Sequence, residues 1–193
     1  RLPLGLLNLA GLYREMGQFD RAQPLYERSL KLREARLGPS HPDVGTSLHS
    51  LGLLHRSKNE LAQAEAYLQR ALKIREAALG AQHASVGATM TAPPSTYQAQ
   101  GRLAEAEPLY RSALANREAR LGPDNLDVVS TINNLAGLAA SQGDLTEAER
   151  LYVDAIARGE RGGGDAGFLS LLIGNLASLQ ASREKWSDAA ASY

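Results

Sequence analysis

The 193-residue sequence contains no cysteine. This excludes disulfide bonds and thiolate metal sites, and it fits a reducing compartment. No apolar run approaches the roughly 18 residues that a membrane-spanning helix needs, and the N-terminal residues lack the pattern of a secretory signal. We therefore expect a cytoplasmic protein without a membrane segment.

An excess of charge of either sign is also missing, because Lys and Arg number 21 and Asp and Glu number 21. No overall field attracts the chain to nucleic acid or to an anionic membrane. Aromatic residues make up only 5%, and β-branched runs are absent. Ala, Leu, Glu, Arg and Gln fill the segments between Gly and Pro, which predicts an all-α fold.

The sequence repeats itself every 42 residues, as Gly38, Gly80 and Gly122 show, each directly after a leucine. A second series with the same spacing comprises Gly17, Asn59, Gly101 and Gly143. Glycine and asparagine tolerate the left-handed conformation that ends many helices. Two breaks in each unit predict two helices in each unit.

Each expected helix carries an apolar or small-residue stripe at helical spacing. In the first helices the stripes are Leu6, Leu9, Ala10 and Tyr13, then Leu48, Leu51, Gly52 and His55, and later Ile132, Leu135, Ala136 and Ala139. In the second helices they include Ala22, Tyr26 and Ser29, then Ala64, Leu68 and Ala71, then Ala106, Tyr110 and Ala113, and finally Ala148, Tyr152 and Ala155. Small residues recur where helices must approach closely.

This pattern resembles the tetratricopeptide repeat, whose usual unit has about 34 residues. The additional residues fit a longer second helix and the connector "LGPSHPD". The longer unit resembles the kinesin light chain subtype in "LGPSHPDV", Leu37 to Val44, and in "INNLAGL", Ile132 to Leu138. The resemblance covers essentially the whole chain and implies a right-handed superhelical solenoid of antiparallel helix pairs.

The expected units are residues 1–38, 39–80, 81–122, 123–164 and an incomplete 165–193, in which Tyr193 falls inside a second helix. We expect the sequence to be a fragment of a longer chain. Neither end shows a polar capping helix. Neighbouring sequence, a partner or oligomerisation would then cover the ends.

The joint between units has recurring polar residues. His41, His83 and Asn125 share one position, which suggests helix capping or a local hydrogen bond rather than metal binding. Pairs of arginine and glutamate precede each joint, and we expect them to form solvated or inter-repeat ion pairs. These pairs are Arg33-Glu34, Arg75-Glu76 and Arg117-Glu118.

The third first helix departs from the pattern around residues 92–95, where Pro93 and Pro94 replace Leu51 and Gly52 of the second unit. An interior proline costs about 3 kcal/mol or more in a helix. The sequence therefore predicts that no continuous helix spans this region. It leaves three alternatives: a tolerated kink, a hinge between two halves, or a degenerate repeat.

The glycine-rich stretch "RGERGGGDAGF", residues 158–168, replaces the usual joint after the fourth unit. Gly162, Gly164 and Gly167 fit the spacing of a dinucleotide-binding motif. That motif requires a preceding strand, whereas this stretch follows an expected helix. We expect a flexible loop and no cofactor.

Residues for catalysis or metal binding are not recognisable. No nucleophile motif or convergent pair of carboxylates is present. His49 and His55 lie six residues apart, which does not place them on one helix face. We expect no enzyme activity and no metal site.

The candidate site is the concave side, where first helices present the residues that the stripe leaves free. These candidate peptide-binding residues are Asn8, Arg14, His49, Arg56, Gln98, Asn133, Asn134 and Asn175. The family resemblance implies a groove for extended peptides, in which asparagine can both donate and accept hydrogen bonds. Only Asn133 and Asn134 keep the family's full pair. Solvated polar positions are the alternative.

Arg14 and Arg56 lie one repeat apart and could hold an acidic side chain. The sequence thus predicts a non-catalytic scaffold that binds a protein or peptide partner, acidic where it meets these arginines. Two alternatives stay open: a structural or self-association module, and a regulatory repeat region of a larger multidomain signalling enzyme.

Overall fold

The computed structural model describes the backbone of residues 2–81 and 83–191, and the side chains of residues 2–81 and 83–183. Ten helices and no strand occur in these described ranges, which confirms the all-α prediction. The chain divides into two compact units, Arg1–Gly101 (unit 1) and Arg102–Tyr193 (unit 2). The division falls inside the third repeat, between its first and second helices.

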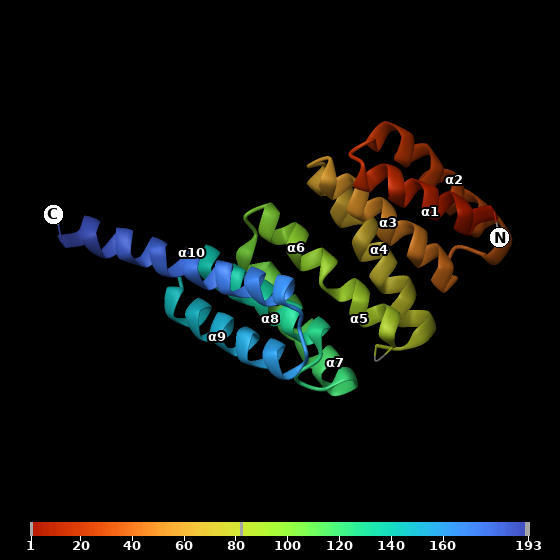
Figure 1. The fold of residues 1–193 in the computed structure, drawn as a ribbon. Coiled ribbons are helices and arrows are strands. Elements are labelled where there is room, and N and C mark those ends of the chain that lie inside the picture. The colour runs from red at the N-terminus through yellow and green to blue at the C-terminus, as the bar shows by residue number, and fades with distance from the viewer. Residues whose placement is uncertain (1, 82, 192–193) are drawn as a thin grey trace. The chain divides into compact units, whose positions relative to one another are not determined.

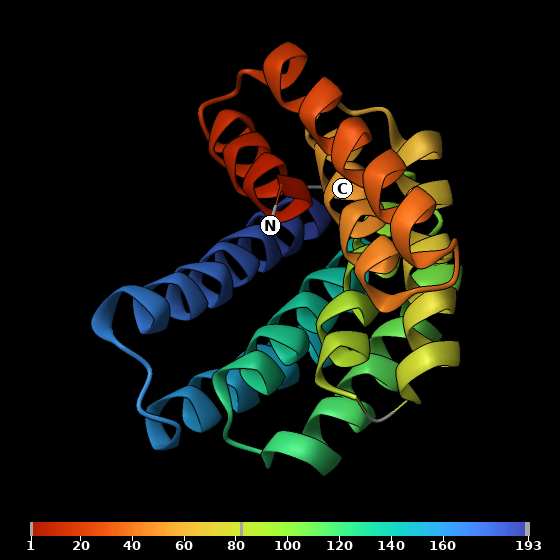
Figure 2. The same cartoon turned by 90° about the vertical axis from the view of Figure 1, so that its right-hand side faces the viewer.

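Unit 1 is a row of antiparallel helix pairs (Figures 1 and 2). Its helices are α1 (Leu2–Glu15), α2 (Phe19–Leu37), α3 (Pro42–Ser57), α4 (Leu61–Leu79), α5 (Ala84–Met90) and α6 (Ala92–Ala99). α2 packs against both α1 and α3 and so joins the first two pairs. Ala10, Ala22, Tyr26, Leu51 and Leu54 form one core cluster across this junction.

Unit 2 contains α7 (Leu103–Leu121), α8 (Leu126–Ser141), α9 (Leu145–Arg161) and α10 (Ala166–Ala191). α8 packs against α7 and α9, and α9 also packs against α10 (Figure 1). α10 is one helix of 26 residues. Tyr193, which the repeat spacing places inside a second helix, lies outside the described residues.

The turns confirm the predicted left-handed positions. The turn between the two helices of each repeat contains one of these positions. Gly17, Asn59, Gly101 and Gly143 have φ angles of 71°, 60°, 75° and 85°. The predicted caps are also present. Nδ1 of His41 accepts a hydrogen bond of 3.1 Å from the Asp43 N–H, and His83 binds the Ser85 N–H in the same way. Oδ1 of Asn125 accepts from the Asp127 N–H at 2.9 Å.

The second-helix stripes are buried as predicted. The small residues Ala22, Ala64, Ala106 and Ala148 are 0% exposed, as are Ser29, Ala71, Ala113 and Ala155. The first-helix stripes of the second and fourth repeats are buried too. Leu9 is the exception, because 42% of it is exposed to solvent. Its predicted place in the core is wrong, since no helix covers that face of α1 in the described chain.

The arginines that precede the joints are buried instead of solvated. Arg33, Arg75 and Arg117 are 7%, 8% and 7% exposed. Nη1 of Arg117 donates to the Asp127 carbonyl at 2.9 Å and to Oγ1 of Thr131 at 2.7 Å. The ion-pair prediction was wrong for these arginines, because the inward-facing guanidinium donates to a carbonyl and a hydroxyl instead of a carboxylate. The buried Nε of Arg117 has no partner among the described residues.

The same contact recurs at the two earlier joints. Arg33 donates to the Asp43 carbonyl at 2.8 Å and to Oγ of Ser47 at 3.0 Å. Arg75 donates to the Ser85 carbonyl at 3.2 Å and to the Thr89 hydroxyl. We call these three contacts the arginine clamps. Each clamp fixes the end of a second helix to the first two turns of the next first helix.

The glutamates next to the clamps behave as predicted at two joints. Glu34 accepts from Arg70 at 2.7 Å, and Glu118 accepts from Arg158 at 2.6 Å. Both are ion pairs between successive repeats. The prediction of inter-repeat ion pairing is therefore confirmed for these glutamates.

The third first helix is broken at Thr91, as Pro93 and Pro94 predicted. Both prolines lie in the first turn of α6, where a missing N–H removes no helical hydrogen bond. The hydroxyls of Ser95 and Thr96 donate to the Ala92 carbonyl at 2.8 and 3.1 Å. α5 and α6 both pack against α4, so both parts of the broken helix belong to unit 1.

The joint after the fourth repeat is shorter than expected. α9 continues to Arg161 and α10 begins at Ala166, so most of residues 158–168 is helical and the predicted long flexible loop is wrong. Gly162 packs so closely that an added Cβ would overlap the Asp124 carbonyl oxygen. No strand precedes these glycines in the described chain, so the context of a dinucleotide-binding motif is missing.

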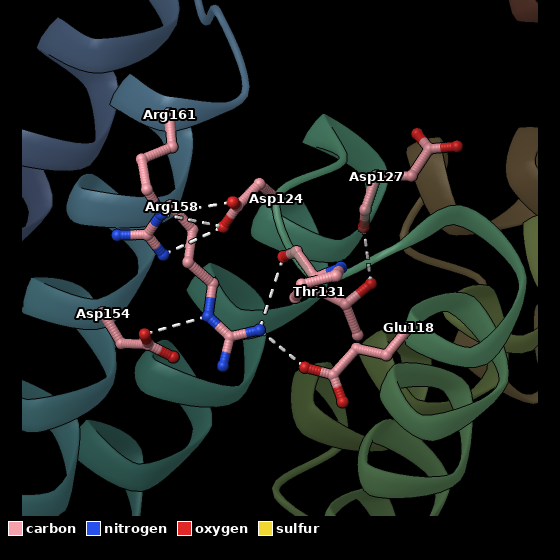
Figure 3. A network of polar contacts seen from close by, with 8 residues as sticks. Glu118, Asp124, Asp127, Thr131, Asp154, Arg158 and Arg161 are labelled. Carbon is pink, nitrogen blue, oxygen red and sulfur yellow. Dashed lines mark hydrogen bonds and ion pairs between the residues drawn. The ribbon is translucent and has the colours of Figure 1, made fainter.

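Two arginines of α9 hold the connector that precedes α8 (Figure 3). Arg158 lies between Glu118 and Asp154, and it donates to Asp154 at 2.9 Å. Both Nε and Nη2 of Arg161 donate to Asp124, at 3.1 and 2.9 Å. The hydrogen bond with Arg161 lowers the pKa of Asp124. This network anchors α9 to the third joint.

Candidate functional site

In unit 1 three predicted site residues are coupled electrostatically, because the charges of Arg14, at the end of α1, and of Arg56, on α3, both act on His49 of α3. Burial, followed by the charges of Arg75, Arg56 and Arg14, lowers the pKa of His49 to about 4. His49 is therefore neutral at neutral pH. We call Arg14, His49 and Arg56 the cationic cluster.

The cluster retains unused hydrogen-bonding capacity. Nδ1 of His49 is buried and has no hydrogen-bond partner among the described residues. Arg56 donates from Nη1 to Oγ of Ser95 at 2.5 Å, which links the cluster to α6. An anionic group placed here would meet guanidinium donors from two neighbouring first helices.

The other two predicted site residues of unit 1 are Asn8, on α1, and Gln98, on α6. Asn8 is exposed on α1, and no hydrogen bond of its side chain occurs in the described chain. Gln98 is half-buried near the end of α6. Gln98 occupies the repeat position of Arg14 and Arg56, so the three mark one row of equivalent positions.

In unit 2 the predicted asparagines also come together. Nδ2 of Asn175 on α10 donates to Oδ1 of Asn133 on α8 at 2.9 Å. Asn134, which follows Asn133 on α8, is half-buried beside this pair. The bond leaves the Nδ2 group of Asn133 and Oδ1 of Asn175 as a donor and an acceptor.

A cavity of about 230 Å³ lies next to this amide pair. Its lining residues come from α8, α9 and α10, and they are Ala140, Tyr152, Asn175, Ser178, Leu179 and Ser182. Burial raises the pKa of the Tyr152 phenol, so the phenol stays protonated at neutral pH. The cavity combines an apolar wall with hydroxyl and amide groups.

Several lining residues were not predicted from the sequence. Tyr152 was assigned only to the core stripe, although it also lines the cavity. Ser178 and Ser182 lie one turn apart on α10, and their hydroxyls donate to the carbonyls of Gly174 and Ser178. Their spacing of four residues along one helix face was the available signal.

Three of the four histidines have structural partners. His55 contacts Glu60 through Nδ1 at 2.5 Å and stacks on Tyr67 with ring centres 5.2 Å apart. His41 and His83 are helix caps. Within the described residues, no three His, Cys, Asp or Glu side chains gather as a potential metal site. No helix of the described chain has the length and apolar character needed to cross a membrane.

Comparison with known proteins places this geometry in a family. The sequence matches the family described as "Tetratricopeptide repeat" over residues 3–92 and 95–161, which is more than half of the chain. A comparison with curated proteins found no match. Tetratricopeptide repeats are generally protein-interaction scaffolds and are typically non-catalytic.

Solved structures share the fold. BtubC (BKLC) from P. vanneervenii has a TM-score of 0.80 and 24% identity, over 95% of this chain and 73% of that one. The kinesin light chain from Podosopora anserina with nearly identical TPR-like repeats has a TM-score of 0.72 and 21% identity, over 93% and 95%. A single-residue variant of that protein gives 0.73 and 20%, over 96% and 99%. The chain belongs to the tetratricopeptide repeat family, and its fold is that of the kinesin light chain-like repeats.

Proposed function

We propose that the chain is a non-catalytic scaffold that binds a peptide segment of a partner protein through polar residues of its first helices. The observation that supports this most strongly is the hydrogen-bonded pair Asn133 and Asn175 beside a cavity of about 230 Å³. An amide pair with one donor and one acceptor remaining matches the two groups of a peptide bond.

In unit 2 the asparagine pair would bind the peptide backbone, and the cavity would take one side chain. Leu179 and Ala140 supply apolar contact, and Tyr152 supplies a phenol. Since the amides bind any backbone alike, the cavity would determine which side chain is accepted.

In unit 1 the cationic cluster would bind an acidic side chain. No ion pair of Arg14 occurs among the described residues, and Arg56 donates to the neutral hydroxyl of Ser95. A carboxylate would pair with the guanidinium of Arg14 or of Arg56. This predicts acidic residues in the part of the partner that lies against unit 1.

The proposal can be tested with a random peptide library presented to the purified chain. Bound peptides should be enriched in Asp and Glu, and the enrichment should disappear in the double variant Arg14→Glu, Arg56→Glu. The matched control is Arg28→Glu, Arg36→Glu, which changes the net charge equally at exposed positions of α2. Equal loss in both variants would refute a local acidic contact.

A second variant separates the two sites. Asn133→Ala with Asn134→Ala should weaken peptide binding without changing the acidic preference, because the cationic cluster is intact. Circular dichroism should show unchanged helicity, since both residues are only half-buried. Peptide binding that is unaffected by the loss of both amides would contradict the role assigned to unit 2.

A further inference from the structure

His49 is a polar side chain that the rest of the chain leaves without compensation. It lies half-buried near the middle of α3. Its Nδ1 atom is buried, and no hydrogen bond to this atom occurs among the described residues. Native structures contain few buried nitrogens that have lost water and gained no protein partner. In a proposed binding site, such a group indicates a role that begins when a ligand is present.

The same repeat position makes a side-chain hydrogen bond in unit 2. Asn133 lies two repeats after His49, and its Oδ1 atom accepts from Nδ2 of Asn175 on α10. In unit 1 the preceding member of this row is Leu7, which packs against the core. The following member is Thr91, at the break between α5 and α6. The buried ring nitrogen therefore finds no counterpart of the asparagine pair in the described chain.

Every charge that acts on His49 is positive. These charges are Arg14 on α1, Arg56 on α3 and Arg75 on α4. Arg75 lies against α3 one turn before His49, because its Nη2 donates to Oγ1 of Thr46 at 2.9 Å. Burial and the three guanidinium groups together hold the pKa of His49 at about 4. The imidazole is thus neutral in surroundings that supply positive charge and no carboxylate.

We propose that His49 couples the binding of an acidic side chain to the uptake of one proton, so that the cationic cluster binds acidic peptides more tightly as pH falls. This inference rests on the proposed function, because it places the acidic side chain at Arg14 and Arg56. A carboxylate bound there offsets the guanidinium charges and favours the imidazolium form. The proton comes from solvent, and both ring nitrogens of the imidazolium then act as donors.

The direction of the effect follows from the two protonation equilibria. The pKa of His49 is about 4 in the free chain, and an adjacent carboxylate moves it back towards the ordinary value of about 6.5. Between these values the complex binds more protons than the free chain, so affinity rises as pH falls through the interval. The partner's aspartates stay ionised at about pH 5, because their ordinary pKa is about 3.9. We expect about tenfold tighter binding at about pH 5 than at about pH 7.5.

The experiment uses a fluorescent peptide of alternating Asp and Ser, whose affinity is measured by anisotropy at both pH values. The native chain should show the gain of about tenfold at the lower pH. His49→Gln should bind with about equal affinity at both, because glutamine forms hydrogen bonds but does not titrate. His41→Asn is the matched control and should keep the gain, since asparagine caps the equivalent helix at position 125. A peptide of alternating Asn and Ser should show no gain.

NMR of the imidazole protons measures the coupling directly. The titration midpoint of His49 should rise by about one pH unit or more when the chain is saturated with the Asp-Ser peptide. Circular dichroism at both pH values should show that the chain and its variants stay folded during the measurement.

The outcomes separate this inference from the proposed function. PH-independent binding that Arg14→Glu with Arg56→Glu abolishes would overturn the coupling and leave the acidic contact intact. An equal gain in His49→Gln would assign the proton to another group and would also overturn the coupling. Failure of the Asp-Ser peptide to bind at either pH would overturn both the acidic contact and the coupling.

Discussion

Nη1 of Arg33 donates a hydrogen bond of 3.0 Å to Oγ of Ser47, fourteen residues later in the chain. The bond joins the last turns of α2 to α3 across a joint. The same pairing links Arg75 with Thr89 and Arg117 with Thr131. Each clamp thus sets where the next first helix begins, and with it where the polar residues of that helix lie.

Replacing Arg117 by methionine should lower the free energy of unfolding by about 2–3 kcal/mol, because buried hydrogen bonds of a charged donor are lost. Thr131→Val should cost less, since it removes one acceptor. A double-mutant cycle measured by urea denaturation should give a coupling of about 1–2 kcal/mol.

The matched control for this cycle is Arg111→Met, because Arg111 is 57% exposed and pairs with Glu107 one turn away. Its effect should stay below about 1 kcal/mol. Similar losses for Arg111→Met and Arg117→Met would show that the clamp has no special contribution to stability.

The clamps show what the sequence could and could not reveal about the fold. Helix ends followed from the 42-residue spacing, because Gly38 and Asn59 mark positions where only certain residues fit. Arg33 followed by Glu34 indicated a solvated surface, because adjacent charges usually face water. A hydroxyl residue recurs fourteen positions after each of these arginines, and this pattern was the signal for burial. The pattern can be interpreted only once the structure shows that the guanidinium turns inward.

His49 should make the protein sensitive to acid. Its pKa is about 4 in the folded chain and about 6.5 when unfolded. The unfolded state therefore binds more protons between these values, so the stability present above about pH 6.5 is lost as pH falls towards about 4. From about pH 7.5 to about pH 5, this group should account for a loss of about 2 kcal/mol.

The measurement compares urea denaturation of the native chain with that of His49→Gln at both pH values. The variant has no titrating group at this position, so it should lose about 2 kcal/mol less over the interval. Parallel pH profiles would contradict the assignment. His41→Asn controls for histidine content, because asparagine already caps the equivalent helix at position 125.

Arg158→Gln should weaken the contact between α9 and the third joint. Arg158 is 21% exposed and pairs with Glu118 and Asp154, so we expect a loss of about 1 kcal/mol that shrinks as salt is raised. Arg150→Gln is the control, since Arg150 is 62% exposed and pairs only locally with Glu147. A larger loss for Arg150→Gln in thermal unfolding would contradict the network in Figure 3.

The first helix of the third repeat, which is broken at Thr91, should be less protected from hydrogen exchange than the other first helices of unit 1. Pro93 and Pro94 carry no N–H, and the break leaves two short helices, α5 with 7 residues and α6 with 8, in place of one continuous first helix. Short helices open more readily. Amides of residues 84–100 should therefore exchange faster than those of α3. Equal protection would show that packing against α4 fully compensates for the break, and it would exclude a hinge there.

The candidate site was predictable in its residue types but not in its pairings. Asn133 and Asn175 lie 42 residues apart, which is the repeat period, but the spacing alone could not show that their amides bind each other. The cavity beside them depends on Tyr152, whose ring the sequence assigned to the core. The predicted burial of Leu9 was wrong for a related reason, because the burial of a helix face depends on which helices pack against it.

The most direct measurement of the central proposal is NMR of the isotope-labelled chain titrated with a peptide selected from the library. Shifts should concentrate on Arg14, His49 and Arg56 in unit 1 and on the side-chain amides of Asn133, Asn134 and Asn175 in unit 2. Shifts confined to the outward faces of α2, α4 and α9, with these residues unaffected, would contradict it.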